Sequence, residues 1–248
     1  MKADSAGLLR CARYAFAPNH YSYCGPERQK DLTAYLSGAV TDQGLSDILH
    51  GFETLISYLR LIAGASHIAD PFDPRVVEAY WIGNRLLNGI SPRQYTDFVT
   101  DGFGLKRKIK PDSVSRIRER VSRAAPFHTA HVVHIFVRTG HRTLIHTAST
   151  IDACRIGWGE VTAVRSGSHD EIRVRTRPVI PSAAGLELGL PVIRIFRNPF
   201  LPVRPGDLVT THWGYVCDRI NRLQMHRLEA LTNRVLGISG LHPGPDGL

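Results

Sequence analysis

One cysteine of this chain lies in the sequence context of a reactive thiol. The segment reads Tyr21-Ser22-Tyr23-Cys24-Gly25-Pro26-Glu27-Arg28. Proline is favoured at the first position of a helix, so Pro26 predicts a helix that runs to about Leu36, with Cys24 just before its N-terminus. The helix dipole and the N–H groups there would lower the pKa of the thiol. Cys24 is therefore a candidate nucleophile, although a small side chain buried in a turn is the commoner role of a cysteine.

A thiol nucleophile needs a group that accepts its proton, and three of the twelve histidines lie close together at His128, His131 and His134. The segment from His131 to Val137 is rich in β-branched residues, which predicts a strand. On a regular strand His131 and His134 would lie on opposite faces, which disfavours a site in which all three histidines bind one metal. His128 and His131 are instead candidate bases for Cys24.

A further histidine, His212, lies at the end of a predicted strand, where Trp213 and Gly214 would turn the chain into its last helix. Strand ends often present catalytic side chains, so His212 is a candidate base or a candidate ligand for a metal or haem, with Cys217 as a second ligand. Helix capping and packing explain the segment equally well. Cys154 we interpret as part of a turn without a catalytic role.

Positive charge is concentrated between residues 106 and 123, where eight cations and two acids give +6 of the chain's formal +9. On a helix Arg116, Arg120 and Arg123 would share a face, because they are four and three residues apart. Guanidinium groups so arranged can bind phosphates, although a solvated surface is the usual role of a charge run. The candidate polyanion-binding residues are Lys106, Arg107, Lys108, Arg116, Arg120 and Arg123. Arg173, Arg175 and Arg177 would form a second strip on a strand.

The composition is that of a globular protein. Of the 248 residues 43% are hydrophobic and 21% are charged, and the chain is long enough to bury a large core. No CxxC pair, signal peptide or apolar span is present, so we expect free thiols, a cytoplasmic location and no membrane partner. The phosphate-binding loops GxGxxG and GxxxxGK[ST] and the motifs GxSxG and HExxH are also missing, so we assign no cofactor and no metal ligand.

The pattern of elements predicts an α+β fold. We expect helices over residues 45–63, from Pro74 towards Gly89, from Pro92 to Val99 and after Pro111, and a last helix from Tyr215 to Leu236. The predicted strands are 131–137, 143–147, 160–165, 172–177, 192–197 and 208–211. A helical part (1–125) would pack on a small, mainly antiparallel sheet in the second part (126–248), with the last helix returning to the helical layer. We expect one continuous unit.

Short motifs are spread over most of the chain. They are residues 12–19 (ARYAFAPN), 23–26 (YCGP), 76–84 (VVEAYWIGN), 154–159 (CRIGWG) and 212–219 (HWxxVCDR). Together they resemble a bacterial and archaeal family of unknown function, sometimes encoded near nickel–iron hydrogenase genes. The resemblance implies one continuous unit and says little about chemistry, and it does not include the basic segment 106–123.

We therefore expect a group-transfer enzyme of biosynthesis. Cys24 would take up an acyl or aminoacyl group, a histidine (128, 131 or 212) would move protons, and the arginines would hold a polyanionic donor while a small molecule accepts the group. Aminoacyl-tRNA is the donor that best accounts for an RNA-binding, positively charged transferase without a nucleotide loop. The alternatives are a metal- or haem-dependent enzyme with His and Cys ligands and a non-catalytic accessory or maturation factor.

Overall fold

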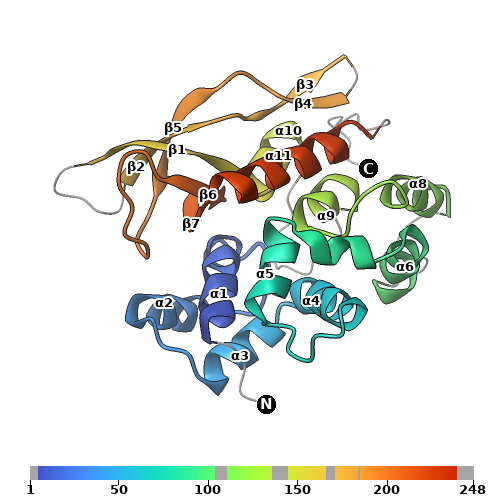
Figure 1. Cartoon of the computed structure of the whole chain (residues 1–248), viewed down its shortest axis with the longest axis horizontal. Helices are drawn as coiled ribbons and strands as arrows, with labels where there is room; N and C mark the ends of the chain where they lie inside the picture. The colour runs from blue at the N-terminus through green and yellow to red at the C-terminus, as the bar shows by residue number, and fades with distance from the viewer. Residues whose placement is uncertain (1–4, 104–110, 136–144, 166–170, 184, 239–248) are drawn as a thin grey trace.

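The protein is an α+β molecule, as the sequence predicts, in which a helical N-terminal half lies beside a mixed sheet (Figure 1). The computed structural model describes residues 5–103, 111–135, 145–165, 171–183 and 185–238. The last helix, α11, runs along the sheet and also contacts α9 of the helical layer. The predicted return of the C-terminal helix is therefore confirmed.

Short helices make up the first half of the chain. Their bounds are α1 (Ser5–His20), α2 (Gln29–Gly38), α3 (Gln43–His50), α4 (Glu53–Ala65), α5 (Pro74–Trp81), the 3-10 turn η1 (Arg85–Gly89), α6 (Pro92–Asp97), the π turn η2 (Phe98–Gly102), α8 (Pro111–Val121), α9 (His128–His134) and α10 (Ala148–Cys154). The C-terminal helix α11 spans Arg222–Leu236.

Side-chain caps fix several of these helices where the sequence places them. The Asp73 carboxylate accepts a hydrogen bond from the backbone of Arg75, with Pro74 in the first turn of α5. Ser91 and Gln94 form a capping box at the start of α6. Two predicted extents are wrong: residues 45–63 belong to two helices, α3 and α4, with a turn between them at Gly51, and α5 ends at Trp81 well before Gly89.

Five strands form one closed sheet in the order β1-β2-β5-β7-β6. Their bounds are β1 (Gly157–Val164), β2 (Glu171–Thr176), β5 (Val192–Arg197), β6 (Leu208–His212) and β7 (Tyr215–Ile220), with a separate hairpin of β3 (Val179–Ser182) and β4 (Gly185–Leu188). The pairs are antiparallel except for β5 and β7, which meet in parallel at Arg197 and Tyr215. Valine, isoleucine and phenylalanine side chains fill the interior of this closed sheet.

The structure corrects three of the strand and helix predictions. The histidine-rich segment is the helix α9 and not a strand, since it makes i to i−4 backbone bonds such as Ile135 N–H to the His131 carbonyl oxygen at 3.0 Å. Residues 145–147 are not in a strand, and 143–144 lie outside the described residues. The segment from Tyr215 begins with the strand β7, and the helix starts only at Arg222.

One hydrophobic core joins the two predicted parts of the chain. Its buried members run from Leu8 in α1 to Leu236 in α11 and include Tyr14, Trp81 and Ile156. Tyr14 stacks on Trp81 with ring centroids 4.9 Å apart, and its hydroxyl lies 2.7 Å from the Thr210 hydroxyl of β6. Helix α1 is thereby fixed to the sheet at the point where β6 ends.

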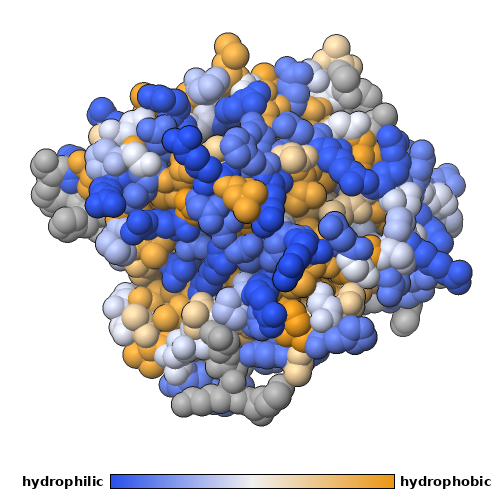
Figure 2. Space-filling view, in the orientation of Figure 1, coloured by the Kyte–Doolittle hydropathy of each residue, from blue (hydrophilic) through white to orange (hydrophobic). Residues whose placement is uncertain are grey.

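The surface seen in Figure 2 is mainly hydrophilic, with hydrophobic residues scattered across it in small groups. In the part of the chain that the structure describes, no helix combines the length and the apolar character needed to cross a membrane.

Candidate functional site

The candidate catalytic residues from the sequence meet at one small cavity of about 60 Å³. Cys24, His128, His131 and His212 all line it, although they are up to 188 residues apart in the chain. Aromatic and aliphatic side chains, including Phe52 and Trp81, form most of the remaining wall. The cavity also contains Cys154, to which the sequence analysis gave no catalytic role.

Helix α9 brings two of the three clustered histidines to the cavity. Residues three apart on a helix are neighbours on its surface, so His128 and His131 line the cavity together. His134 is six residues from His128 and lies about 120° further round the helix, away from the cavity. His134 is not among the residues that line the cavity, and a strand would have placed His128 and His131 on opposite faces.

His212 is presented by the end of β6. Trp213 and Gly214 follow in a two-residue turn with positive φ angles of 49° and 81° and lead into β7. The His212 Nδ1 lies 2.8 Å from the carbonyl oxygen of Tyr14. Because a carbonyl can only accept, we assign the proton of the neutral ring to Nδ1 and the lone pair to Nε2.

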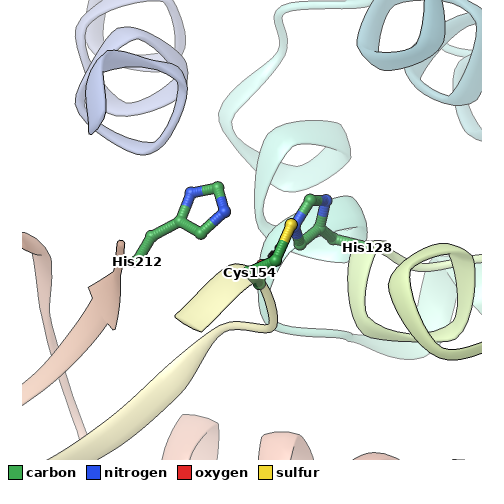
Figure 3. Close-up of side chains that lie close together, drawn as sticks. All are labelled: His128, Cys154 and His212. Atoms are coloured by element: carbon green, nitrogen blue, oxygen red, sulfur yellow. Dashed lines mark hydrogen bonds between the residues drawn. The ribbon is translucent and has the colours of Figure 1, made fainter. Parts of the chain in front are cut away.

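Cys154 lies at the end of helix α10 and is tied to the strand that carries His212. The backbone N–H of Trp213 donates to the Ala153 carbonyl oxygen at 2.8 Å, which fixes the β6–β7 turn against α10. His128, Cys154 and His212 are buried, with exposed fractions of 8%, 6% and 2%. Their ligand-type atoms all lie within 4.8 Å of one another, and Figure 3 shows the His212 ring pointing toward the other two side chains.

Hydrogen bonds orient the imidazole of His128. Its Nε2 lies 2.9 Å from the carbonyl oxygen of Cys154, so we assign the ring proton to Nε2. Its Nδ1 then accepts from the hydroxyl of Tyr80 at 3.1 Å. Burial raises the pKa of Tyr80 well above its usual value, and nearby charge on Cys24 and Cys154 would raise it further. Tyr80 therefore stays protonated and serves as a hydrogen-bond donor at the cavity.

His131 belongs to a chain of buried polar groups behind the cavity. Its Nδ1 lies 3.3 Å from the Tyr58 hydroxyl, which is 3.2 Å from the hydroxyl of Tyr95. Burial raises the pKa of both tyrosines, so neither ionises near neutral pH. Helix α9 positions His131 to face the cavity. His131 does not belong to the cluster of His128, Cys154 and His212.

Cys24 lies in a loop and not beside a helix N-terminus, which corrects the prediction for this residue. Helix α2 begins only at Gln29, and the Cys24 N–H donates to the Pro18 carbonyl oxygen at 3.2 Å. The loop is held by Asn19, whose side-chain amide donates to the carbonyl oxygen of Cys24 at 3.0 Å. Gly25 has a φ of 82°, and a Cβ there would overlap the ring of Phe52.

The described residues of the basic segment lie away from this cavity. None of the described cations of residues 106–123 lines it. Arg116 and Arg123 are exposed, whereas Arg120 is 8% exposed and does not form a surface face with them. Lys106, Arg107 and Lys108 lie outside the described residues. On β2, Arg173 and Arg175 are exposed while Ile172 and Val174 are buried, as predicted for a strand.

Cys217, the sequence-based partner of a metal-binding histidine, lies elsewhere. It is buried on β7, where its thiol lies 3.7 Å from the Tyr215 carbonyl oxygen, and burial raises the pKa of the thiol well above its usual value. Cys154 takes the place that the sequence analysis gave to Cys217. The sequence feature that could have indicated Cys154 is the CRIGWG segment, in which a cysteine lies between the end of a helix and the start of a strand. The segment does not indicate which other residues lie close to that cysteine.

The three converging side chains can hold a metal ion. Two imidazole nitrogens and one thiolate sulfur form a ligand set that zinc, copper and iron accept. In both His212 and His128 one ring nitrogen donates a hydrogen bond to a backbone carbonyl oxygen, and the other nitrogen carries the lone pair that could bind a metal. This is the usual arrangement for a metal-binding histidine. Within the described residues this is the single cluster of three or more such groups.

Comparison with curated proteins and with solved structures gives no match. The chain does match a protein family over residues 3–241, nearly its whole length. This agrees with the resemblance of its motifs to an uncharacterised family. The protein belongs to DUF6390, a family of unknown function.

Proposed function

We propose that this protein is a metal-dependent enzyme that acts on a small molecule in the cavity beside His128, Cys154 and His212. The observation that carries the proposal is the convergence of these three buried side chains within 4.8 Å. They come from α9, the end of α10 and the end of β6, and backbone hydrogen bonds hold them in place. Buried imidazole and thiol groups that converge from three elements favour a ligand set over ordinary packing.

The ligand distances suit a transition metal after a modest closure. With Zn–N bonds of about 2.0 Å and a Zn–S bond of about 2.3 Å, tetrahedral ligand atoms lie about 3.3–3.6 Å apart. The three atoms here, all within 4.8 Å, would therefore have to approach by about 1 Å. Rotation of side chains supplies such a shift without movement of the backbone. Zinc is the ion that this set of two nitrogens and one sulfur fits best.

Binding of the metal would change the contacts of two side chains. His212 would bind through Nε2 and keep the hydrogen bond from Nδ1 to Tyr14. His128 would bind through Nδ1, which requires the Tyr80 hydroxyl to turn away from that atom. The hydroxyl would then lie beside the metal, where it can donate a hydrogen bond to a bound molecule. Tyr80 is thus a positioning residue in this proposal.

Three protein ligands leave a coordination position for a water or substrate, as in catalytic zinc sites. Zinc held by His128, Cys154 and His212 would supply Lewis acidity there and would lower the pKa of a bound water. The cavity of about 60 Å³ limits the substrate to a few non-hydrogen atoms, and its mostly apolar wall favours an uncharged one. Haem does not fit, because ligands of that size occupy cavities of roughly 300–1,000 Å³.

Cobalt binding tests the ligand set. We expect the metal-free protein to take up one Co²⁺ per chain and to show the absorption of a cobalt–thiolate bond together with tetrahedral cobalt bands. The Cys154→Ser protein should lose the thiolate band. His212→Ala should bind cobalt at least about 100-fold more weakly, because loss of an outer-shell partner alone costs about 10–100-fold. Cys24→Ser is the matched control, because this cysteine lines the same cavity outside the cluster and its loss should leave the spectrum unchanged.

Two results would overturn the metal proposal. The first is the absence of stoichiometric cobalt or zinc binding by a folded, reduced protein. The second is a thiolate band that persists in Cys154→Ser and disappears in Cys24→Ser or Cys217→Ser, which would assign the metal to a different cysteine.

A second candidate is covalent catalysis by Cys24, favoured by its position on the same cavity wall as three histidines. The thiolate would attack an acyl carbon, the leaving group would depart with a proton from a histidine, and an acceptor would then take the acyl group from sulfur. No cation of residues 106–123 that the structure describes adjoins the cavity, so a small acyl donor fits better than an aminoacyl-tRNA. Transfer of an acyl group from a small thioester to Cys24, detected by intact mass and lost in Cys24→Ala, tests this candidate.

A further inference from the structure

A second and larger cavity of about 660 Å³ shares no lining residue with the cavity that the histidines line. Helix α10 contributes Asp152 and Ala153 to it, β5 contributes Arg194 and Ile195, and the turn after β6 contributes Trp213. Its volume is within the range of about 300–1,000 Å³ that small-molecule sites occupy. Neither the family nor the proposed metal site gives it a role.

The charged groups of this cavity leave one positive charge uncompensated. Asp152, Arg155 and Arg194 are its charged lining residues. Arg155 is 2% exposed and donates from Nε and Nη to one Asp152 carboxylate oxygen at 3.1 and 2.9 Å. Further bonds to the carbonyl oxygens of Ile156 and Arg177 fix its guanidinium in place. Arg155 therefore neutralises Asp152 as a buried pair.

Arg194 is the cation that remains for a ligand. It donates from one Nη to the other Asp152 oxygen at 2.6 Å, and its side chain is 46% exposed. A guanidinium has five N–H donors, so Arg194 can bind a second carboxylate while it keeps its bond to Asp152. The backbone N–H of Val179 also donates to Asp152 at 2.8 Å, which keeps this carboxylate paired if Arg194 turns toward a ligand.

Apolar side chains surround this cation. Pro178, Val179, Phe196 and Trp213 line the cavity, and Ile180, with an exposed fraction of 37%, lies among the lining residues. Phe196 is on the same face of β5 as Arg194, because the two residues are two apart on the strand. An isolated surface isoleucine is ordinary, but Ile180 on a cavity that also holds Phe196 and an arginine contributes to an amphipathic site. Apolar side chains and an arginine in one cavity are complementary to a ligand that has a hydrocarbon chain and an anionic end.

We infer that this cavity binds a small aliphatic carboxylate, with the carboxylate on Arg194 and the hydrocarbon chain against Ile180 and Phe196. The bond to the guanidinium sets the orientation, and burial of the chain increases the affinity about fourfold for each CH₂ group. The inference does not depend on the metal, because no ligand of the proposed metal site contributes to this cavity.

Calorimetric titration of the full chain with octanoate tests the site. We expect one octanoate per chain, with binding about tenfold weaker for the uncharged octanamide and weaker still for acetate. Arg194→Gln should reduce octanoate affinity about tenfold while circular dichroism shows an unchanged fold. Arg173→Gln is the matched control, since this arginine is exposed on the neighbouring strand β2 and does not line the cavity.

Several outcomes would overturn the inference. Equal affinities for octanoate and octanamide would show that Arg194 does not bind the carboxylate. An equal loss of octanoate affinity in Arg173→Gln and Arg194→Gln would indicate nonspecific attraction to a positive surface. Binding of inorganic phosphate without any binding of octanoate would make this an anion site with no place for the hydrocarbon chain. Cys154→Ser should bind octanoate normally, so the test is independent of the metal proposal.

Discussion

A buried histidine outside the cavity gives a pH dependence of stability that can be worked out from the structure. His134 of α9 is completely buried, and burial lowers its pKa from 6.5 to about 3, with the charge of Arg120 and then His146 acting in the same direction. In the unfolded chain the imidazole takes up a proton below about pH 6.5, whereas in the folded protein it does not until about pH 3. Acid therefore favours unfolding.

The expected size of this effect follows from linkage. From about pH 7 to about pH 5 the preference of the unfolded state for this one proton lowers the free energy of unfolding by about 2 kcal/mol. In His134→Leu the side chain cannot titrate, so the pH dependence over this interval should decrease by that amount. His226, which is exposed on α11, is the control, and His226→Gln should leave the pH dependence as it is.

Urea denaturation at several pH values between these limits measures the effect directly. The comparison is between the slopes of unfolding free energy against pH, so a change in the baseline stability of His134→Leu does not matter. If His134→Leu and the unaltered protein lose stability in parallel, the histidine is not buried in its neutral form and the reasoning is wrong.

Three further predictions concern packing, a buried ion pair and thiol reactivity. Gly159→Ala should destabilise the protein by about 2 kcal/mol or more in urea denaturation, because a Cβ there would lie 2.2 Å from the Arg175 carbonyl oxygen. The control is Gly64→Ala on α4, which should not destabilise the protein because the space around Gly64 is open. Asp218→Asn should cost about 3 kcal/mol by the same assay, since the carboxylate accepts bonds from Arg10 and Arg13 at 2.6 and 3.1 Å in a largely buried setting. A thiol reagent should modify the partly exposed Cys24 before the buried Cys217, as peptide mass mapping would show, and equal rates would contradict the burial.

The sequence predicts much of the fold because local signals act over a few residues. Pro74 and the Ser91–Gln94 pair mark true helix starts, and the alternation of Arg173 and Arg175 with apolar residues marks a true strand. The failure at residues 131–135, the described part of the predicted strand, has a physical cause. Val132, Val133 and Ile135 have a high strand propensity, but contacts of α9 with α8 and α11 bury this segment as a helix and override the preference.

The candidate site shows what local signals cannot supply. The residue types and positions indicated Cys24, His128, His131 and His212, and all four line one cavity. The sequence offered no means to choose Cys154 over Cys217, because that choice depends on the packing of α10 against the end of β6. A long-range backbone bond from Trp213 N–H to the Ala153 carbonyl oxygen joins the residues that follow His212 and precede Cys154, and a sequence does not show such a contact.

The proposed metal ligands lie where the helical layer meets the sheet, and this location limits when the site can exist. His128 belongs to the helical layer, His212 to the sheet, and Cys154 to the helix that joins the two. None of these elements alone contains two of the three side chains, so the cluster forms only when α9, α10 and the end of β6 have come together. A metal that binds this cluster would therefore stabilise the contact between the layers, since it binds the folded chain and not the unfolded one. The same three side chains would then serve both catalysis and the stability of the contact between the helical layer and the sheet.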